Sequence, residues 1–217
     1  MTHVIATRAG VGGTAGVVQQ QVLRFARVPI SQPILMVVRH GRKIVRGPGI
    51  ELTIEQGEAV AIAQDQVFDI ENHVSPQGHY EAHWLTWDPA LLRGFERQKP
   101  SARVVDGAHT LGRLPPAFQR AIDAAIEAIR EPASVPDRIA VHRLSEVLAW
   151  IEEHGGRFEI HEPTTTTARV RRCILASPDA GWTSAAVAAE LGMSEATLRL
   201  CSTAYAPKLE WRALRSD

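Results

Sequence analysis

Residues 181–199 read GWTSAAVAAELGMSEATLR and place a glycine between two helix signals. Thr183 is a suitable N-cap, and an apolar stripe at helical spacing follows it: Ala186, Val187 and Leu191. This pattern predicts a short helix that ends at Gly192, because glycine readily adopts the positive φ of a tight turn.

A second helix is expected directly after Gly192. Met193 is an apolar residue in the turn, and Ser194 is the N-cap of the second helix. Leu198 points inward. The outward positions of this helix are then Glu195, Ala196 and Arg199. Two short helices joined by a glycine turn are typical of a helix-turn-helix, whose second helix enters a DNA major groove. An ordinary helical hairpin fits the same pattern.

The composition is that of a globular protein. The 217 residues, 45% of them hydrophobic, suffice for one large domain or two small ones. No apolar run reaches the roughly 18 residues of a membrane helix, and the N-terminus has no secretory signal, so we expect a cytoplasmic protein. Cys173 and Cys201 have no metal-binding or redox spacing, which indicates reduced thiols.

The net charge of the chain neither requires nor excludes binding to nucleic acid. The chain is neutral overall, which argues against binding of nucleic acid through the net charge of the whole protein. Residues 168–217 carry seven basic and five acidic side chains, a net charge of +2. This excess permits DNA binding but does not require it.

The first half of the chain predicts a β-domain. Residues 1–20 are small and glycine-rich, and we expect a flexible arm there. From residue 21 to residue 112, short β-branched runs alternate with Gly and Pro turns, which favours an antiparallel sandwich or barrel. Within it, residues 32–40 and 42–46 read as a hairpin.

Helical periodicity begins at residue 113. Residues 113–156 predict two helices, and the second carries an apolar stripe broader than one partner helix would cover. We therefore expect this segment to dimerise. Residues 157–167 have the composition of a linker, and residues 168–217 contain the partial helix-turn-helix.

Nine histidines raise the question of a metal site. His79 and His83 would share a strand face, with Glu81 between them and His73 nearby. A metal-bearing cupin usually presents His-x-His with a glutamate shortly after, and His-x-His does not occur here. We expect no metal and no cofactor, and histidines that lie at the surface or make hydrogen bonds.

Catalytic motifs are also missing from the sequence. It has no Gly-x-Ser-x-Gly elbow, and neither cysteine has a histidine beside it, so we expect no enzymatic activity and no catalytic residue. Aromatic residues at strand spacing favour core over a ligand pocket: Tyr80, Trp84 and Trp87. Basic residues before the helix-turn-helix could touch phosphates or simply be solvated: Arg169, Arg171 and Arg172.

The order of these parts resembles the AraC-type (AraC/XylS) transcriptional regulators, which have a cupin-like β-domain, two dimerising helices, a linker and a DNA-binding domain. The resemblance is carried by Trp182-Thr183, Val187-Ala188, Leu191-Gly192-Met193-Ser194 and Thr197-Leu198-Arg199. It implies an α+β chain that regulates transcription as a homodimer on double-stranded DNA, with a small molecule as a candidate effector.

The resemblance places the recognition helix from Ser194 onward, with DNA-binding residues Ser194, Glu195, Ala196, Thr197 and Arg199. Arg199 could pair with guanine or hold a phosphate, and Glu195 could accept from cytosine or cap the helix.

The match to the family stops at Leu200. Members carry a second helix-turn-helix that needs roughly another 50 residues, and a basic residue where this chain has Leu200. With a truncated DNA-binding domain, specific DNA binding is expected to be weak. The alternative to a regulator is a cupin-type small-molecule-binding protein or metalloenzyme.

Overall fold

The computed structural model describes residues 2–47, 49–95, 102–160, 166, 169–170, 173–174 and 181–198. The chain divides into two compact units, residues 1–160 and 161–217. This boundary lies inside the segment 157–167 for which a linker is predicted. Among the described residues, no helix is both long enough and apolar enough to cross a membrane.

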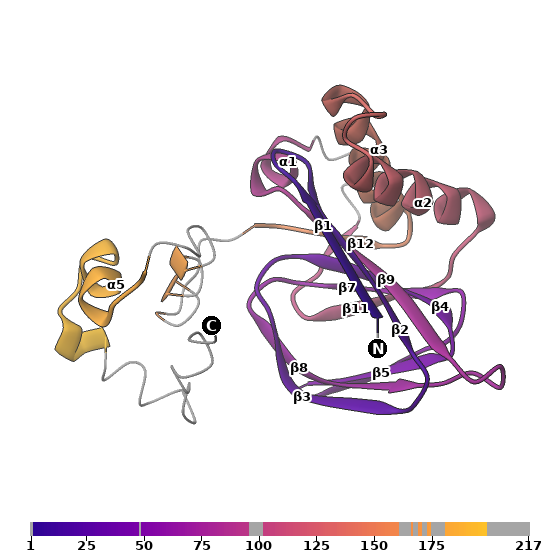
Figure 1. Ribbon diagram of the computed structural model, residues 1–217, viewed down its shortest axis with the longest axis horizontal. Coiled ribbons are helices and arrows are strands. Elements are labelled where there is room, and N and C mark those ends of the chain that lie inside the picture. Colours follow the sequence, from indigo (N-terminus) through magenta and orange to yellow (C-terminus); the bar gives the residue numbers. More distant parts are fainter. Residues whose placement is uncertain are drawn as a thin grey trace. The chain divides into compact units, whose positions relative to one another are not determined.

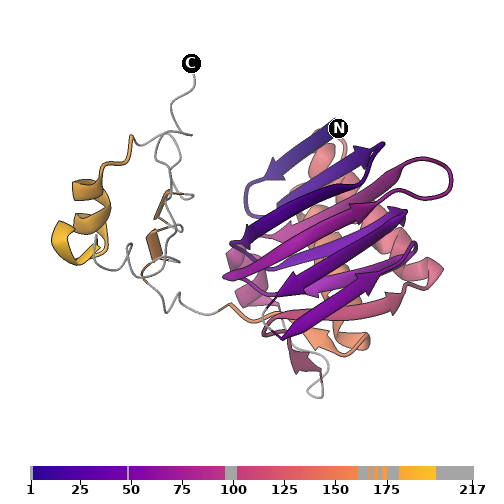
Figure 2. The same cartoon turned by 90° about the horizontal axis from the view of Figure 1, so that it is seen from below.

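Two antiparallel sheets form the first unit (Figures 1 and 2). The six-stranded sheet has the order β1 (Thr2–Arg8), β2 (Gly12–Gln19), β9 (Tyr80–Trp87), β4 (Ile34–His40), β7 (Glu58–Ile62), β11 (Ala108–Arg113). The four-stranded sheet has the order β3 (Leu23–Ile30), β8 (Gln66–His73), β5 (Arg42–Gly47), β6 (Ile50–Ile54). The predicted antiparallel β-domain is thus confirmed.

Strand alternation sends β4 side chains into two different cores. Ile34, Met36 and Val38 point into the space between the sheets and pack there with residues of the four-stranded sheet such as Phe68. Leu35 and Val37 point to the outer face and pack with the helices. Both faces of this strand are therefore buried, which explains its uninterrupted apolar sequence.

Helices α2 (Pro116–Arg130) and α3 (Asp137–Glu153) cover the outer face of the six-stranded sheet (Figure 1). Their apolar faces are buried against it, as Phe118, Ile122, Leu144 and Ile151 show, each fully inaccessible to solvent. Most of the broad stripe on α3 is therefore covered by the chain's own sheet, whereas Ile139 at its start is 44% exposed. The covered part of the stripe needs no second subunit to bury it, and the homodimer stays a prediction.

Smaller elements close the ends of the first unit. Helix α1 (Pro89–Gly94) starts at Asp88, whose carboxylate accepts from the Ala90 amide at 2.8 Å. Strands β10 (Arg103–Val104) and β12 (Gly156–Arg157) pair in parallel, and the second of them directly follows α3.

The prediction of a flexible arm over residues 1–20 is wrong. Strands β1 and β2 form an antiparallel hairpin there, and β2 pairs along its whole length with β9. The glycines serve close packing: a Cβ on Gly12 would lie 2.2 Å from the Thr86 carbonyl oxygen. A high glycine content therefore reflects a crowded strand here, not a mobile one.

The predicted hairpin of residues 32–40 and 42–46 is also wrong. β4 belongs to the six-stranded sheet and β5 to the four-stranded one, so the two strands do not pair. Gly41 lies between them with φ +82°, and a Cβ there would approach the His73 carbonyl oxygen to 2.3 Å. A glycine between two strands signals a sharp turn, but the choice between a hairpin and a change of sheet depends on distant strands.

Candidate functional site

The predicted DNA-contacting segment lies in the second unit and begins with helix α5 (Ser184–Glu190). The Thr183 hydroxyl accepts from the Ala186 amide at 3.1 Å and caps this helix, as predicted. Gly192 follows with φ +66°, and the Met193 amide donates to the Ala188 carbonyl at 2.9 Å. The chain turns there because only glycine enters this backbone region without strain.

A second helical segment covers residues 195–198. The Ser194 hydroxyl accepts from the Thr197 amide at 3.1 Å and lies 2.8 Å from the Thr197 hydroxyl. Ser194 is therefore the cap that the sequence predicts.

A small apolar core holds these pieces together. It consists of Val187, Ala188, Leu191 and Leu198, with Val170, Cys173, Trp182 and Met193 packed against it. Ala186 is exposed, so the inward stripe uses the neighbouring Ala188 in its place. The Arg169 guanidinium donates to the Leu191 carbonyl at 3.1 Å, which gives this arginine a structural contact at the end of α5.

The predicted DNA-contacting residues differ in their accessibility. Ser194, Ala196 and Thr197 are exposed, whereas Glu195 is half-buried. Arg199 lies outside the described residues, as do Arg171, Arg172 and Cys201. The three exposed positions can contact a partner molecule without any rearrangement of the apolar core.

A group of buried polar side chains lies between the two sheets. Lys43 is only 5% exposed, and its Nζ donates to Asn72 Oδ1 at 2.8 Å. The Asn72 amide in turn donates to Gln19 Oε1 at 3.1 Å. Burial lowers the pKa of Lys43 to about 7, so the neutral amine is readily populated near physiological pH.

Tyr80 lies beside this lysine. Its ring centroid is 5.5 Å from Lys43 Nζ, and burial raises the pKa of its hydroxyl well above the ordinary value. The buried hydroxyls of Tyr80 and Ser75 have no hydrogen-bond partner among the described residues. The described residues thus leave the hydrogen-bonding capacity of these two buried hydroxyls unfilled.

The aromatic residues of β9 divide between the two cores, as the core interpretation predicts. Tyr80 packs between the sheets, while Trp87 packs under the helices and donates from Nε1 to the Leu144 carbonyl at 3.1 Å. Trp84 is only half-buried.

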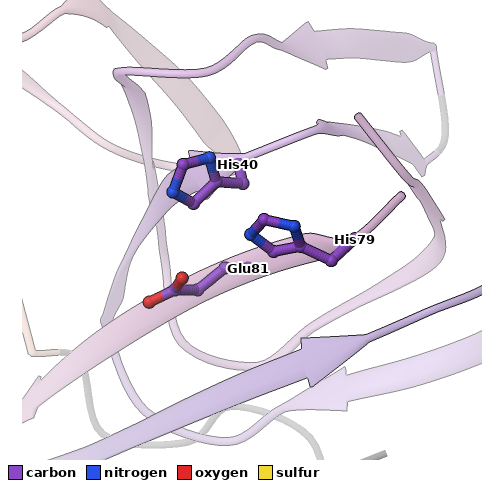
Figure 3. A group of neighbouring side chains, drawn as sticks. All are labelled: His40, His79 and Glu81. Carbon is purple, nitrogen blue, oxygen red and sulfur yellow. The ribbon is translucent and has the colours of Figure 1, made fainter. Parts of the chain in front are cut away.

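The outer face of β9 carries a histidine and carboxylate group (Figure 3). His40, His79 and Glu81 bring their ligand atoms within 4.8 Å of one another. The sequence pointed to His79 and Glu81 but missed His40, which the pairing of β4 with β9 places opposite Glu81. His73 is separate from this group, since it lies on β8 in the other sheet with its Nε2 2.9 Å from Glu71 Oε1.

His83 lies next to this group. Its Nε2 is 3.5 Å from Glu81 Oε1, and burial together with the charge of Arg39 lowers its pKa. Arg39 is itself paired with Asp123 of α2.

The chain matches no family model and no curated protein. Among solved structures, it is similar to ToxT from Vibrio cholerae with a bound unsaturated fatty acid, at 11% identity and a TM-score of 0.57. The match covers 98% of this chain and 76% of ToxT. This chain shares the fold of ToxT.

Two further similar structures have TM-scores below 0.5. The AraC-like transcriptional activator CuxR matches 95% of this chain and 82% of its own at 14% identity, with a TM-score of 0.45. A cupin superfamily protein from Desulfitobacterium hafniense matches 40% of this chain and 77% of its own at 7% identity, with a TM-score of 0.33. ToxT and CuxR are AraC-family regulators with an N-terminal cupin-like domain.

Proposed function

We propose that this chain is a transcriptional regulator of the AraC type rather than an enzyme, and that it binds double-stranded DNA through residues 183–199 as a helix-turn-helix. The observation that carries the proposal is the similarity to ToxT, which extends over 98% of the chain and thus includes the second unit. The capped helix, the Gly192 turn and the exposed positions after it support the same assignment.

Base recognition is assigned to the residues after the turn. Ser194 begins the second helical segment, and Ala196 and Thr197 are exposed on it. Arg199 follows one residue after the buried Leu198, and a guanidinium can donate two hydrogen bonds to a guanine. Glu195 is assigned to cytosine or to the helix N-terminus, where a carboxylate is favoured.

The test is selection of binding sites from a randomised double-stranded DNA library by the full chain. A recovered consensus would then be used to measure affinity at physiological salt. Arg199→Ala should weaken binding to the consensus by about 1–3 kcal/mol, which is roughly tenfold to a hundredfold, and relax one position of the consensus. Arg138→Ala, a change of the same kind at an exposed position of α3, is the matched control.

Recovery of no consensus, or equal loss for both arginine variants, would contradict the proposal. A large salt dependence without sequence preference would indicate phosphate contacts alone.

We also propose homodimerisation, through a surface other than the part of the α3 stripe that the sheet already covers. Sedimentation of the full chain at micromolar concentration measures the oligomeric state directly. A monomer at every concentration tested would remove this part of the proposal.

We further propose that the first unit takes a small-molecule effector with a carboxylate group. ToxT was solved with an unsaturated fatty acid, and the interior of this chain offers Lys43 among apolar side chains, beside the unpaired hydroxyl of Tyr80. Burial disfavours the protonated lysine because it removes solvation by water. A carboxylate nearby favours the protonated form because it supplies an opposite charge.

Oleate below its micellar concentration is the probe for this site, with binding measured by calorimetry. Lys43→Met should reduce the affinity at least about tenfold, since it removes the charge and keeps the chain length. Arg42→Met, on the exposed side of the same strand, should leave the affinity unchanged. Equal binding by wild type and Lys43→Met would exclude Lys43 as the carboxylate partner.

A further inference from the structure

We propose that His40, His79 and Glu81 bind a divalent transition-metal ion such as Zn²⁺ on the outer face of the six-stranded sheet. Their three ligand atoms lie within 4.8 Å of one another, and all three residues are half-buried (Figure 3). Two imidazoles and one carboxylate are a donor set that zinc and related ions accept readily.

Strand register brings the three residues together. His40 of β4 pairs with Glu81 of β9, and paired residues in an antiparallel ladder share a face. His79 lies directly before β9, two residues ahead of Glu81, and Figure 3 shows its ring beside His40 and Glu81. The His40 and His79 ring centroids are 4.5 Å apart.

A β-bulge gives His40 this position. Val38 points into the space between the sheets, and strict alternation would send His40 to the same side. The register shift between Val38 and His40 adds one residue and turns His40 to the outer face.

The three ligand atoms lie close enough together to bind one ion after small side-chain movements. Metal bonds of about 2.0–2.1 Å place tetrahedral ligands about 3.4 Å apart, so side-chain rotations of about 1 Å bring atoms separated by 4.8 Å into range. Three protein ligands leave a fourth position for water or a small ligand, as in open zinc sites.

A second observation points to a ligand at the same place. The buried Nδ1 of His40 has no hydrogen-bond partner among the described residues. A buried polar atom without a partner lowers the stability of the fold. An ion bound to one nitrogen of the His40 ring would fix the tautomer, and the other nitrogen could then donate to water or to a neighbouring acceptor.

A neighbouring histidine supports the carboxylate. His83 Nε2 lies 3.5 Å from Glu81 Oε1. Arg39 of β4 forms an ion pair with Asp123 of α2. His83 can therefore orient the Glu81 carboxylate from outside the ligand set.

This site differs from the one considered from the sequence alone. The expectation of no metal rested on the missing His-x-His motif, which places both histidines on one strand. Here the second histidine comes from a neighbouring strand, so the missing motif says nothing about this site.

The experiment is zinc titration of the full chain by calorimetry at pH 7.5, after chelation and dialysis, with Co²⁺ absorption to report the geometry. We expect one equivalent of zinc to bind with micromolar affinity or tighter, and tetrahedral Co²⁺ absorption. His40→Ala, His79→Ala and Glu81→Gln should each weaken zinc binding at least about tenfold, because each removes one of three ligands. His142→Ala, an exposed histidine on α3, is the matched control and should bind as wild type does.

Circular dichroism melting accompanies each variant, and Glu81→Gln, which preserves the size of the side chain, decides the outcome if a histidine variant fails to fold. Zinc binding that is absent, or that Glu81→Gln and His40→Ala leave unchanged, would overturn the proposal. The zinc titration involves no DNA. The metal proposal can therefore fail while the regulator proposal stands, and the regulator proposal can fail while the metal proposal stands.

Discussion

The surroundings of Lys43 change its chemistry strongly. It lies between the two sheets, with Asn72 as a hydrogen-bond partner, and burial lowers its pKa from 10.5 to about 7. The unfolded chain therefore binds a proton that the folded chain releases between these two pH values. The stability of the fold must then rise with pH across that interval.

We expect Lys43→Met to remove this pH dependence. In the wild type, Lys43 should contribute a rise of about 1.4 kcal/mol per pH unit in the free energy of unfolding above pH 7. Urea unfolding at pH 7.5 and pH 9 measures the slope, and Arg42→Met is the control that should retain it. A wild-type slope near zero would mean that the lysine stays charged when folded.

Arg8 shows how one side chain fixes the position of two helices. It is the last residue of β1, and its guanidinium donates to the Ala128 carbonyl at 2.6 Å and to the Val135 carbonyl at 2.7 Å. Its Nε donates to Asp137 Oδ1 at 3.0 Å. The end of α2, the connection after it and the start of α3 are thus joined to the N-terminal hairpin.

We predict that Arg8→Lys lowers the free energy of unfolding by about 1–3 kcal/mol. A lysine cannot reach three acceptors at once, and a buried carbonyl without a donor costs this much. Chemical denaturation of the two proteins measures the difference. Arg138→Lys, at an exposed position, should change stability by less than about 0.5 kcal/mol, and an equal loss in both variants would contradict the role of Arg8.

The molecule as a whole consists of two compact units with separate apolar cores. The first unit buries its side chains in two layers, one between the sheets and one under the helices. The second unit has a much smaller core around Val187 and Leu191. A small core buries less surface per residue, so most of the stability belongs to the first unit.

We therefore expect residues 1–160 alone to fold cooperatively. Their melting temperature should lie within a few degrees of the main transition of the full chain, and they should bind zinc but not DNA. Calorimetric melting and zinc titration of this fragment test the expectation. A fragment that melts without a cooperative transition would show that the first unit needs residues beyond 160.

Local patterns predicted α2 and α3, since helical periodicity over residues 113–156 acts within a few turns. Short β-branched runs between Gly and Pro turns likewise predicted most of the strands between residues 32 and 87, whereas α1 was not predicted. In the second unit, the caps at Thr183 and Ser194 and the turn at Gly192 were read correctly for the same reason.

The site residues were only partly predictable. The exposed position Ala196 follows from helical periodicity, and His79 with Glu81 from strand periodicity. Helical periodicity also placed Glu195 outward, where the structure has it half-buried, and Thr197 came from the family resemblance. His40 and Lys43 could not be identified, because their surroundings are made by strands far away in the sequence.

The sequence by itself determined the two helices of residues 113–156, the caps and the turn around Gly192, most strands between residues 32 and 87, and which residue types are available for chemistry. Only the tertiary structure decided that the glycine-rich N-terminus is a strand pair, that Gly41 separates two sheets, and that His40 faces Glu81. These three facts depend on pairing between distant segments, in which backbone hydrogen bonds and burial outweigh local preference.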